Sequence, residues 1–355
     1  MLMSNEPIWF DEFVLRRRLS RRGFLGAGVA MAGGYLLAAC GAGGSTSGPA
    51  AGVGKGKTIG LILNGFNVYD QCLATGVLTG LEGTSYQFVG LQGNFDAAQE
   101  VTNFSTLVSR KVDGIIVIPN TTESSSRGAL AAKQAGIPVV NVLWSDPTPG
   151  DTAFVARVRA DNIKGGNLMA EWISKNTLPG EILVVTGVPG QGFSEKLLQG
   201  LREGLAVYGN GGWKIAEVQP GFFTRTTAIS AAQNMMTAHP SAKIIVDFAA
   251  EMGNGIASFL QKNARTDMIS ITSDGNEEMV PYIKSGQTSA VRYYSSAQEG
   301  LVGAQLIRDY LEKGVSHPEI IDLQQAMVTK SDIDQWTAKQ PLCYDKYHDQ
   351  VSKIG

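Results

Sequence analysis

The chain contains 355 residues, of which 43% are hydrophobic, and its formal net charge is −2. This length is sufficient for two domains of ordinary size, and the mildly acidic balance argues against nucleic acid as a partner and against a basic membrane-binding face. No histidine lies near a cysteine or acidic cluster with metal-ligand spacing, and no Gly-x-Ser-x-Gly motif occurs. We therefore expect no metal, no cofactor, no catalytic residue and no enzyme activity.

The first feature along the chain is a basic segment, followed by a Gly- and Ala-rich apolar run that ends at a cysteine. Arg21 and Arg22 precede an aromatic residue and a leucine, an order that resembles the twin-arginine export motif. Leu37–Cys40 resembles the bacterial lipoprotein box, in which cleavage leaves a cysteine that then carries lipid. Two such signals at adjacent positions predict an exported lipoprotein.

The apolar run Gly23–Ala39 could alternatively be a transmembrane helix. It is weakly apolar and lies at the short limit of roughly 17–25 residues that a spanning helix needs, so a signal segment fits better. We interpret residues 1–39 as a signal peptide and residues 40–56, rich in Gly, Ser and Ala, as a flexible tether. The mature protein is then expected outside the cytoplasm, in the periplasm or on the outer face of the cell membrane, and membrane-anchored through lipid on Cys40.

Beyond the tether, short apolar runs typical of buried parallel strands alternate with helical patterns. In the first half, the predicted strands are Ile59–Leu63, Phe88–Leu91, Gly114–Ile118 and Val139–Leu143, and the predicted helices are Asp70–Leu81, Ala97–Ser109 and Ser124–Ala135. This alternation is typical of a doubly wound α/β fold.

The second half repeats the plan. Its predicted strands are Ile182–Thr186, Ile215–Val218, Ile244–Phe248, Ile269–Thr272 and Ser289–Tyr293, with a final strand expected within Ile320–Val328. Its predicted helices are Asn162–Lys175, Glu195–Val207, Thr226–Ala238, Gly255–Asn263, Glu278–Lys284 and Gln298–Glu312. The sequence therefore predicts two doubly wound, Rossmann-like α/β lobes around a cleft, with ligands bound beyond the carboxyl ends of the strands.

Several short motifs follow one another in the order and spacing of a known family. They are Gly93–Asp96, Val112–Asn120, Ala135–Val140, Ala160–Asn162 with Gly165-Gly166, and Asp274-Gly275. From about residue 57 to 314 the chain resembles the type I periplasmic substrate-binding proteins of the ribose/galactose class, which serve ABC transporters. The resemblance implies a monomeric receptor that closes by a hinge over a small polar solute and delivers it to an ABC permease. The alternative is a signalling module that presents its ligand to a membrane sensor.

In that family the chain crosses between the lobes three times. The matching crossings fall near Arg159, Ser295 and Leu323. The resemblance therefore assigns residues 57–159 and 295–323 to the N-terminal lobe and residues 160–294 and 324–355 to the C-terminal lobe.

The resemblance also implies candidate binding residues. Asn120 matches an amide that binds the ligand, Asp274 matches a carboxylate, and Phe223 matches an aromatic ring that stacks on a sugar. Asn67 lies in the first strand–helix loop, where relatives place a ligand-binding amide, although the aromatic pair of this loop is altered and includes Tyr69.

Other positions depart from the sugar-binding pattern. Trp144 stands where relatives carry an arginine, Glu195 replaces a second arginine at a helix start, and Tyr293 and Tyr294 lie where relatives carry a glutamine. Fewer guanidinium donors argue against a simple pentose or hexose. Glu195 and Asp274 facing each other across the cleft would favour a solute with hydrogen-bond donors or a positive charge, and the aromatic rings could stack on a ring or surround an ammonium group. We therefore expect a small polar solute that is sugar-like, a polyol or amine-bearing. Each ring could instead be ordinary core packing, and Glu195 a solvated acid in the first turn of a helix.

Two cysteines, Cys72 and Cys343, lie beyond the proposed lipid site. An oxidising compartment would permit a bridge between them. The expected lobe boundaries, however, place them in different lobes, where a bridge would oppose hinge motion. We therefore expect two free, buried thiols.

Overall fold

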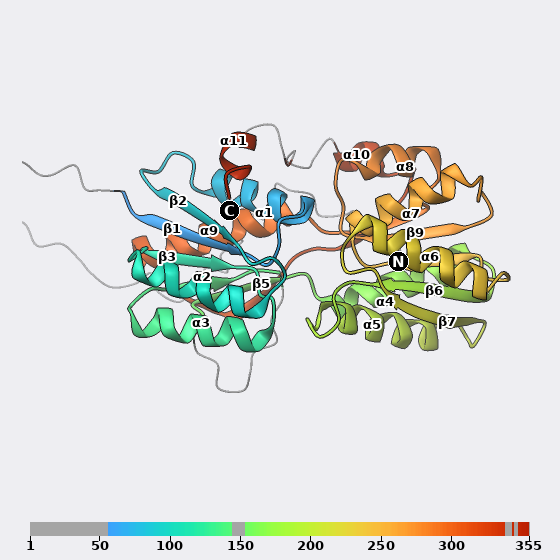
Figure 1. Cartoon of the computed structure of the whole chain (residues 1–355), viewed down its shortest axis with the longest axis horizontal. Helices are drawn as coiled ribbons and strands as arrows, with labels where there is room; N and C mark the ends of the chain where they lie inside the picture. Colours follow the sequence, from blue (N-terminus) through green and yellow to red (C-terminus); the bar gives the residue numbers. More distant parts are fainter. Residues whose placement is uncertain (1–55, 144–152, 338–342, 344–346, 355) are drawn as a thin grey trace, which may run out of the picture. The chain divides into compact units, whose positions relative to one another are not determined.

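The computed structural model describes residues 56–143, 153–337, 343 and 347–354. This part of the chain forms two six-stranded sheets, each with helices on both faces (Figure 1). The fold class expected from the sequence, two doubly wound α/β lobes, is confirmed. The predictions for the signal peptide, the tether and their residues Arg21, Arg22 and Cys40 lie outside the described residues.

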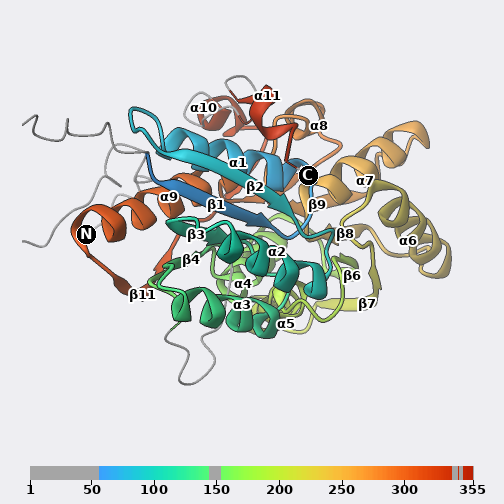
Figure 2. The same ribbon diagram turned by 60° about the vertical axis from the view of Figure 1, so that its left-hand side comes forward.

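The first lobe is formed by two separate stretches of the chain. Its elements are β1 (Thr58–Leu63), α1 (Val68–Gly80), β2 (Gln87–Gln92), α2 (Ala97–Ser109), β3 (Gly114–Val117), α3 (Thr122–Gln134), β4 (Val139–Asn141), β5 (Ala156–Arg159), α9 (Ser296–Lys313) and β11 (His317–Asp322). The strands pair in parallel in the order β11-β5-β4-β3-β1-β2. Helices α1 and α9 pack together on one face of this sheet, and α2 and α3 pack on the other (Figure 2).

The alternation of side chains along β1 explains why both faces of this sheet are covered. Ile59 and Leu61 point to one side, where they pack with Leu73 of α1. Ile62 points to the other side, where it packs with Phe104 of α2. Because successive side chains of a strand point to opposite faces, a continuously apolar strand needs a helix layer on each face.

The second lobe repeats this architecture. Its elements are α4 (Asn162–Asn176), β6 (Gly180–Thr186), α5 (Phe193–Tyr208), β7 (Trp213–Pro220), α6 (Arg225–Ala238), β8 (Ile244–Asp247), α7 (Ala250–Lys262), β9 (Ile269–Ser273), α8 (Met279–Ser285), β10 (Ala290–Tyr293), β12 (Ala326–Val328) and α10 (Ile333–Thr337). The strand order is β12-β10-β9-β8-β6-β7, and only the β12–β10 pair in this sheet of described strands is antiparallel. Helices α4 and α5 pack together, as do α6 and α7.

The chain passes between the two sheets between β5 and α4, between β10 and α9, and between β11 and β12. The third passage corrects the single strand predicted within Ile320–Val328. That segment holds the end of β11 in the first sheet and the whole of β12 in the second. Leu323, which is buried, lies between them and donates its amide to the carbonyl of Arg159 at 2.7 Å. The strand is interrupted here because one continuous strand cannot pair in two separate sheets.

The C-terminal segment departs from the predicted lobe assignment. Helix α10 contacts α8 of the second lobe, but α11 (His348–Val351) contacts α1 of the first lobe. The hydroxyl of Tyr347 donates to Glu82, and Ile354 lies directly beside Gly90 of β2. Residues 347–354 therefore pack on the first lobe, although the sequence had assigned 324–355 to the second.

Cys343 forms a disulfide with Cys72 of α1, with a Cα–Cα distance of 4.5 Å. The carbonyl of Cys343 accepts a hydrogen bond from Thr75 on the same helix at 2.6 Å, and its amide donates to Glu277 of the second lobe at 2.7 Å. The expectation of two free thiols was wrong. It assumed that the tail stays with the second lobe, whereas the tail returns to α1 and brings the two cysteines together.

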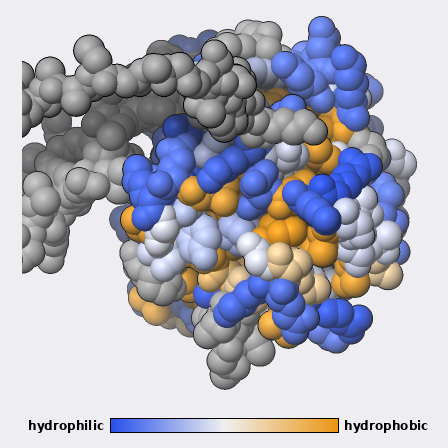
Figure 3. All heavy atoms as spheres, turned by 90° about the vertical axis from the view of Figure 1, so that its left-hand side faces the viewer, coloured by the Kyte–Doolittle hydropathy of each residue, from blue (hydrophilic) through white to orange (hydrophobic). Residues whose placement is uncertain are grey.

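None of the described helices is both long and apolar enough to cross a membrane. On the end of the first lobe that Figure 3 shows, apolar areas are interrupted by hydrophilic side chains.

Candidate functional site

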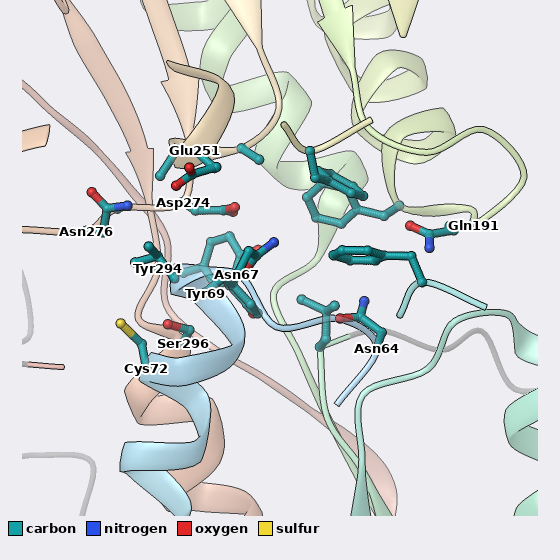
Figure 4. Close-up of a pocket in the computed structure, with 18 residues that line it drawn as sticks. Asn64, Asn67, Tyr69, Cys72, Gln191, Glu251, Asp274, Asn276, Tyr294 and Ser296 are labelled. Atoms are coloured by element: carbon teal, nitrogen blue, oxygen red, sulfur yellow. The ribbon is translucent and has the colours of Figure 1, made fainter. Parts of the chain in front are cut away.

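A cavity lies between the carboxyl ends of the two sheets, with about 630 Å³ of space that protein atoms do not fill (Figure 4). Its lining comes from both lobes: Asn64, Asn67, Val68, Tyr69, Cys72, Phe95, Leu143, Gln191, Phe193, Phe223, Ala249, Ala250, Glu251, Asp274, Gly275, Asn276, Tyr294 and Ser296. Almost all of these residues follow a strand or begin the next helix, which is where ligands bind in open α/β sheets.

Two equivalent turns supply the main aromatic wall of the cavity. After β2, Asn94 and Phe95 have φ values of 53° and 55°, and after β7, Phe222 and Phe223 have φ values of 54° and 56°. Left-handed backbone at two successive non-glycine residues is uncommon and costs free energy. Its repetition in both lobes indicates that the fold holds these two turns in a fixed shape.

Each of the two turns lays a phenyl ring over a glycine at the end of the lobe's first strand. A Cβ on Gly65 would lie 2.1 Å from Cζ of Phe95, and a Cβ on Gly187 would lie 1.9 Å from Cζ of Phe223. The absence of a side chain at these glycines lets each ring lie against the backbone and point across the cleft. The two rings meet there, with centroids 5.9 Å apart and planes inclined by 33°.

Helix caps fix the end of each turn. The carboxylate of Asp96 accepts hydrogen bonds from the amides of Ala98 and Gln99 at 2.6 and 3.0 Å, which starts α2. Thr224 accepts from the amide of Thr227 at 3.3 Å and starts α6. Because each cap satisfies otherwise unpaired backbone donors, it anchors the turn to a rigid helix.

The opposite side of the cavity carries a buried carboxylate. Asp274 follows β9 with φ 63° and is 6% exposed. Burial raises its pKa to about 6, and the nearby Arg292 and Ser273 oppose this rise. Figure 4 shows the Asp274 side chain directed from the strand end into the cavity.

Arg292 of β10 lies behind this carboxylate and is fully buried. Its guanidinium donates to Ser273 at 2.9 Å, Asn162 at 3.2 Å and Gln325 at 2.8 Å, all of them neutral acceptors. It also lies 4.4 Å from the ring centroid of Tyr294, a cation–π contact. Arg292 is therefore already coordinated by protein groups and does not line the cavity.

A second buried acid supports Tyr69. The Tyr69 hydroxyl donates to Glu299 of α9, a residue with no exposed surface. Burial raises the pKa of Glu299 to about 8, and the hydrogen bond from Tyr69 opposes the rise. The ring of Tyr69 packs edge-on against Tyr294, with centroids 6.1 Å apart, so two tyrosines form the wall beside Asp274.

Asn67 occupies the N-cap of α1. Its side-chain oxygen accepts from the amide of Asp70 at 3.2 Å, and the Asp70 carboxylate accepts from the amide of Asn67 at 3.0 Å. This reciprocal pair is a capping box. It uses the oxygen of Asn67, and Figure 4 shows the amide nitrogen directed into the cavity.

A second hollow occurs on the second lobe alone, lined by Arg202, Leu205, Ala206, Gly211, Trp213 and Ile215. It lies between α5 and β7 and receives no residue from the first lobe. Elsewhere in the described residues, no group of His, Cys, Asp and Glu side chains is arranged to hold a metal ion.

A family model described as the periplasmic binding protein domain matches residues 78–314. The chain belongs to this family. The match spans most of both lobes, and it includes strands and loops that form the cavity.

Curated relatives of this periplasmic binding protein cover most of its length. The ribose import binding protein of Salmonella typhimurium is 25% identical over 259 residues, which are 72% of this chain and 85% of that protein. The xylitol-binding protein of Mycolicibacterium smegmatis is 24% identical over 313 residues, 86% of each chain. The first relative is named for ribose import and the second for xylitol binding. The family to which the chain belongs is one of binding proteins, not of enzymes.

Solved structures share the fold. A galactofuranose binding protein superposes with a TM-score of 0.75 at 17% identity and covers 81% of this chain and 100% of its own. An ABC transporter solute binding protein from Agrobacterium vitis, with bound D-fucose, has a TM-score of 0.74 at 23% identity and covers 80% and 99%. The likeness confirms the two-lobed architecture.

Five of the residues proposed from the sequence come together in the cavity lining. They are Asn67, Tyr69, Phe223, Asp274 and Tyr294. Trp144, another candidate that follows a strand, lies outside the described residues. The five residues follow the ends of β1, β7, β9 and β10. The sequence could therefore identify them from their positions after the predicted strands.

Three other candidates lie outside the lining, which corrects their predicted position. Asn120 is 1% exposed, and its side-chain amide donates to the carbonyl of Asp96 at 3.4 Å. It therefore stabilises the turn that contains Phe95. Glu195 accepts the amides of Gly190 and Gly192 at 2.8 and 2.9 Å, which folds the glycine loop back on its own helix.

Tyr293 is the third of these residues. It is buried in a cluster with Trp336 of α10 and Val328 of β12, on a different side of the sheet from the cavity. Adjacent residues of a strand point to opposite faces. Since Tyr294 enters the cavity, Tyr293 is directed away from it.

Sequence reasoning missed several lining residues: Asn64, Phe95, Gln191, Phe193, Glu251, Asn276 and Ser296. All of them follow strands within a few residues, so the same positional signal was present. Phe95 was read only as part of a family motif. Its role depends on the left-handed turn and on Gly65, neither of which the sequence shows directly.

Proposed function

We propose that this protein is an extracytoplasmic receptor that binds one small ring-shaped polar solute per chain and delivers it to an ABC importer. The observation that carries the proposal is the position of the cavity, which strand-end loops of both lobes line together. A solute held there contacts both lobes at once, so binding favours their closed arrangement. Acting as a monomer, the closed receptor then presents the solute to the permease.

The chemistry of the lining supports a sugar or a polyol, including forms that bear an amine. Phe95, Phe193 and Phe223 offer apolar surface to one face of a ring. Asp274 and the amide of Asn67 offer polar partners to its substituents, as in other small-molecule sites. The relatives are named for ribose import and xylitol binding, and a structural neighbour holds D-fucose.

A thermal-shift screen tests this function. The panel should hold sugars, polyols, amino sugars, nucleosides and quaternary amines. At roughly a hundred times the dissociation constant, a true ligand should raise the free energy of unfolding by about 2.7 kcal/mol. If no member of the panel raises the melting temperature, the proposed function is contradicted.

We also propose that the receptor is exported by the twin-arginine route and anchored by lipid on Cys40. The support is the sequence of residues 20–40. Replacing Cys40 with Ala should release the protein from membrane fractions, and replacing Arg21 and Arg22 with Lys should retain folded protein in the cytoplasm. A Cys40→Ala protein that stays as firmly membrane-bound as the parent would contradict the anchor.

A further inference from the structure

The described lining of the cavity between the lobes carries negative but no positive charge. Among its described lining residues there is no lysine, arginine or histidine, and the charged side chains are Glu251 and Asp274. Building on the proposed function, we infer that the receptor selects a ring-shaped solute that carries a protonated amine, with the ammonium group placed on Asp274 between the tyrosine and phenylalanine walls.

The two acids of the lining differ in how they are already paired. Glu251 receives two hydrogen bonds from Arg225, at 2.6 and 3.2 Å. Arg225 is shared with Glu278, so the ion pair engages Glu251 directly. Asp274 has no ion pair within 4 Å among the described residues. It accepts a hydrogen bond from Ser273 at 3.3 Å, and the Tyr294 hydroxyl and the Ala250 amide also stabilise its ionised form. Glu251 is thus held by a cation of the protein, whereas Asp274 is the lining carboxylate that a cationic ligand can still pair with.

Arg292 does not remove this preference. Its donors are engaged by Ser273, Asn162 and Gln325, and its planar face is covered by Tyr294. It therefore lowers the cost of burying Asp274 without occupying the face of the carboxylate that Figure 4 shows turned to the cavity. A buried carboxylate is stabilised further by a directly bound cation.

Aromatic rings surround the same position. Tyr69 and Tyr294 pack edge-on with centroids 6.1 Å apart, and both line the cavity beside Asp274. Phe95 and Phe223 form the opposite wall. The faces of aromatic rings attract cations, whereas a neutral hydroxyl gains much less from them. Together the walls and the carboxylate favour an ammonium group over a hydroxyl at this point of the ring.

The protonation of Asp274 links binding to pH. Its pKa in the free protein is raised to about 6 by burial, so a bound ammonium would displace a proton when the pH is below that value. Several titratable or charged groups surround Asp274 on the neighbouring elements. They are Tyr69 of α1, Asp247 of β8, Glu251 of α7, Arg292 of β10, Tyr294 directly after β10, and Glu299 of α9.

The test compares matched ligands that differ in one group. Calorimetry at pH 7.5 should be run with D-glucosamine, D-galactosamine and D-mannosamine, each against its neutral parent sugar and its N-acetyl derivative. At least one amine should bind ten-fold or more tightly than both of its neutral partners. Its affinity should fall with added salt and fall about ten-fold per pH unit below about pH 6.

Two variants locate the effect. Asp274→Asn should abolish the preference for the amine, with a loss of ten-fold or more for the amine and less than about three-fold for the neutral sugar. Asp247→Asn is the matched control, because Asp247 is a buried acid that does not line the cavity and its pKa is raised well above the usual range by burial. It should leave the preference unchanged. The salt and pH profiles of the wild-type protein test the inference even if Asp274→Asn does not fold.

The outcomes separate the inference from the function on which it rests. If neutral sugars bind as tightly as their amines, or more tightly, the amine inference is overturned and the receptor function stands. An amine preference that persists in Asp274→Asn also overturns it. If neither class binds, the proposed function is itself contradicted and the inference falls with it.

Discussion

The two lobes build the same turn at the cleft but bring different chemistry to it. Phe95 and Phe223 each follow the second strand of their lobe, each adopts a left-handed backbone, and each lies over a glycine. In the described lining, the second lobe adds the acids Asp274 and Glu251, with Arg292 buried behind Asp274, whereas the first lobe adds Asn64, Asn67 and Tyr69. The turn is common to both lobes, and the charged side chains of the described lining come from the second lobe alone.

Both lobes contain buried acids whose pKa values are raised. In the first lobe, burial raises the pKa of Asp70 and of Glu100 to about 7 and that of Glu299 to about 8. In the second lobe, burial raises the pKa of Asp274 to about 6 and that of Asp247 well above its usual range. A raised pKa means that the folded protein holds more protons than the unfolded chain between the two values.

The largest expected effect follows from these acids. Stability should fall as the pH rises from about 4 towards 8, by up to about 1.4 kcal/mol per pH unit for each group that is still protonated in the folded state and already ionised in the unfolded chain. Urea denaturation of the ligand-free protein at pH 5, 6.5 and 8 measures this. Glu299→Gln, which keeps an oxygen for Tyr69, should flatten the curve most between pH 6 and 8. A stability that rises across this range would contradict the assigned directions.

The next effect concerns the tail, which the disulfide attaches to α1 of the first lobe. Replacing Cys72 and Cys343 together with Ser should lower the free energy of unfolding by about 2–4 kcal/mol, because the unfolded chain loses a cross-link between distant residues. The denaturation midpoint of the variant should match that of the wild type treated with reductant. A variant with the midpoint of the untreated wild type would show that the bridge does not form.

The glycines beneath the two rings offer a matched pair. Gly65→Ala and Gly187→Ala should each cost about 1–3 kcal/mol of stability, since the new Cβ would overlap a phenyl ring and force it to move. The two costs should be similar, because the turns are equivalent. Thermal denaturation measures them, with Gly180→Ala as a control at a glycine that has open space around it. A large cost in one lobe alone would break the equivalence.

The smallest expected effect is the coupling between the rings across the cleft. A double-mutant cycle of Phe95→Ala and Phe223→Ala should give an interaction energy of about 0.5–1.5 kcal/mol in the stability of the ligand-free protein. Additive effects of the two changes would mean that the lobes do not meet through these rings in solution.

The sequence predicted most of the fold because the central strands are uninterrupted apolar runs. It also predicted five of the eighteen lining residues of the cavity, since residues such as Asp274, Phe223 and Tyr294 follow strands. It misplaced Glu195 because nothing local shows that a glycine loop will bend back to bind it. The disulfide could not be predicted because it depends on a tail that returns to α1, a contact between residues far apart in the chain.

The most direct test of the receptor assignment is a calorimetric titration of the solute that gives the largest thermal shift. It should be performed on the wild type, on Phe223→Ala and on Arg202→Ala, which alters the separate hollow of the second lobe. We expect one solute per chain, an affinity at least ten-fold weaker in Phe223→Ala, and an unchanged affinity in Arg202→Ala. Binding that survives Phe223→Ala but is lost in Arg202→Ala would place the solute elsewhere and contradict a site between the lobes.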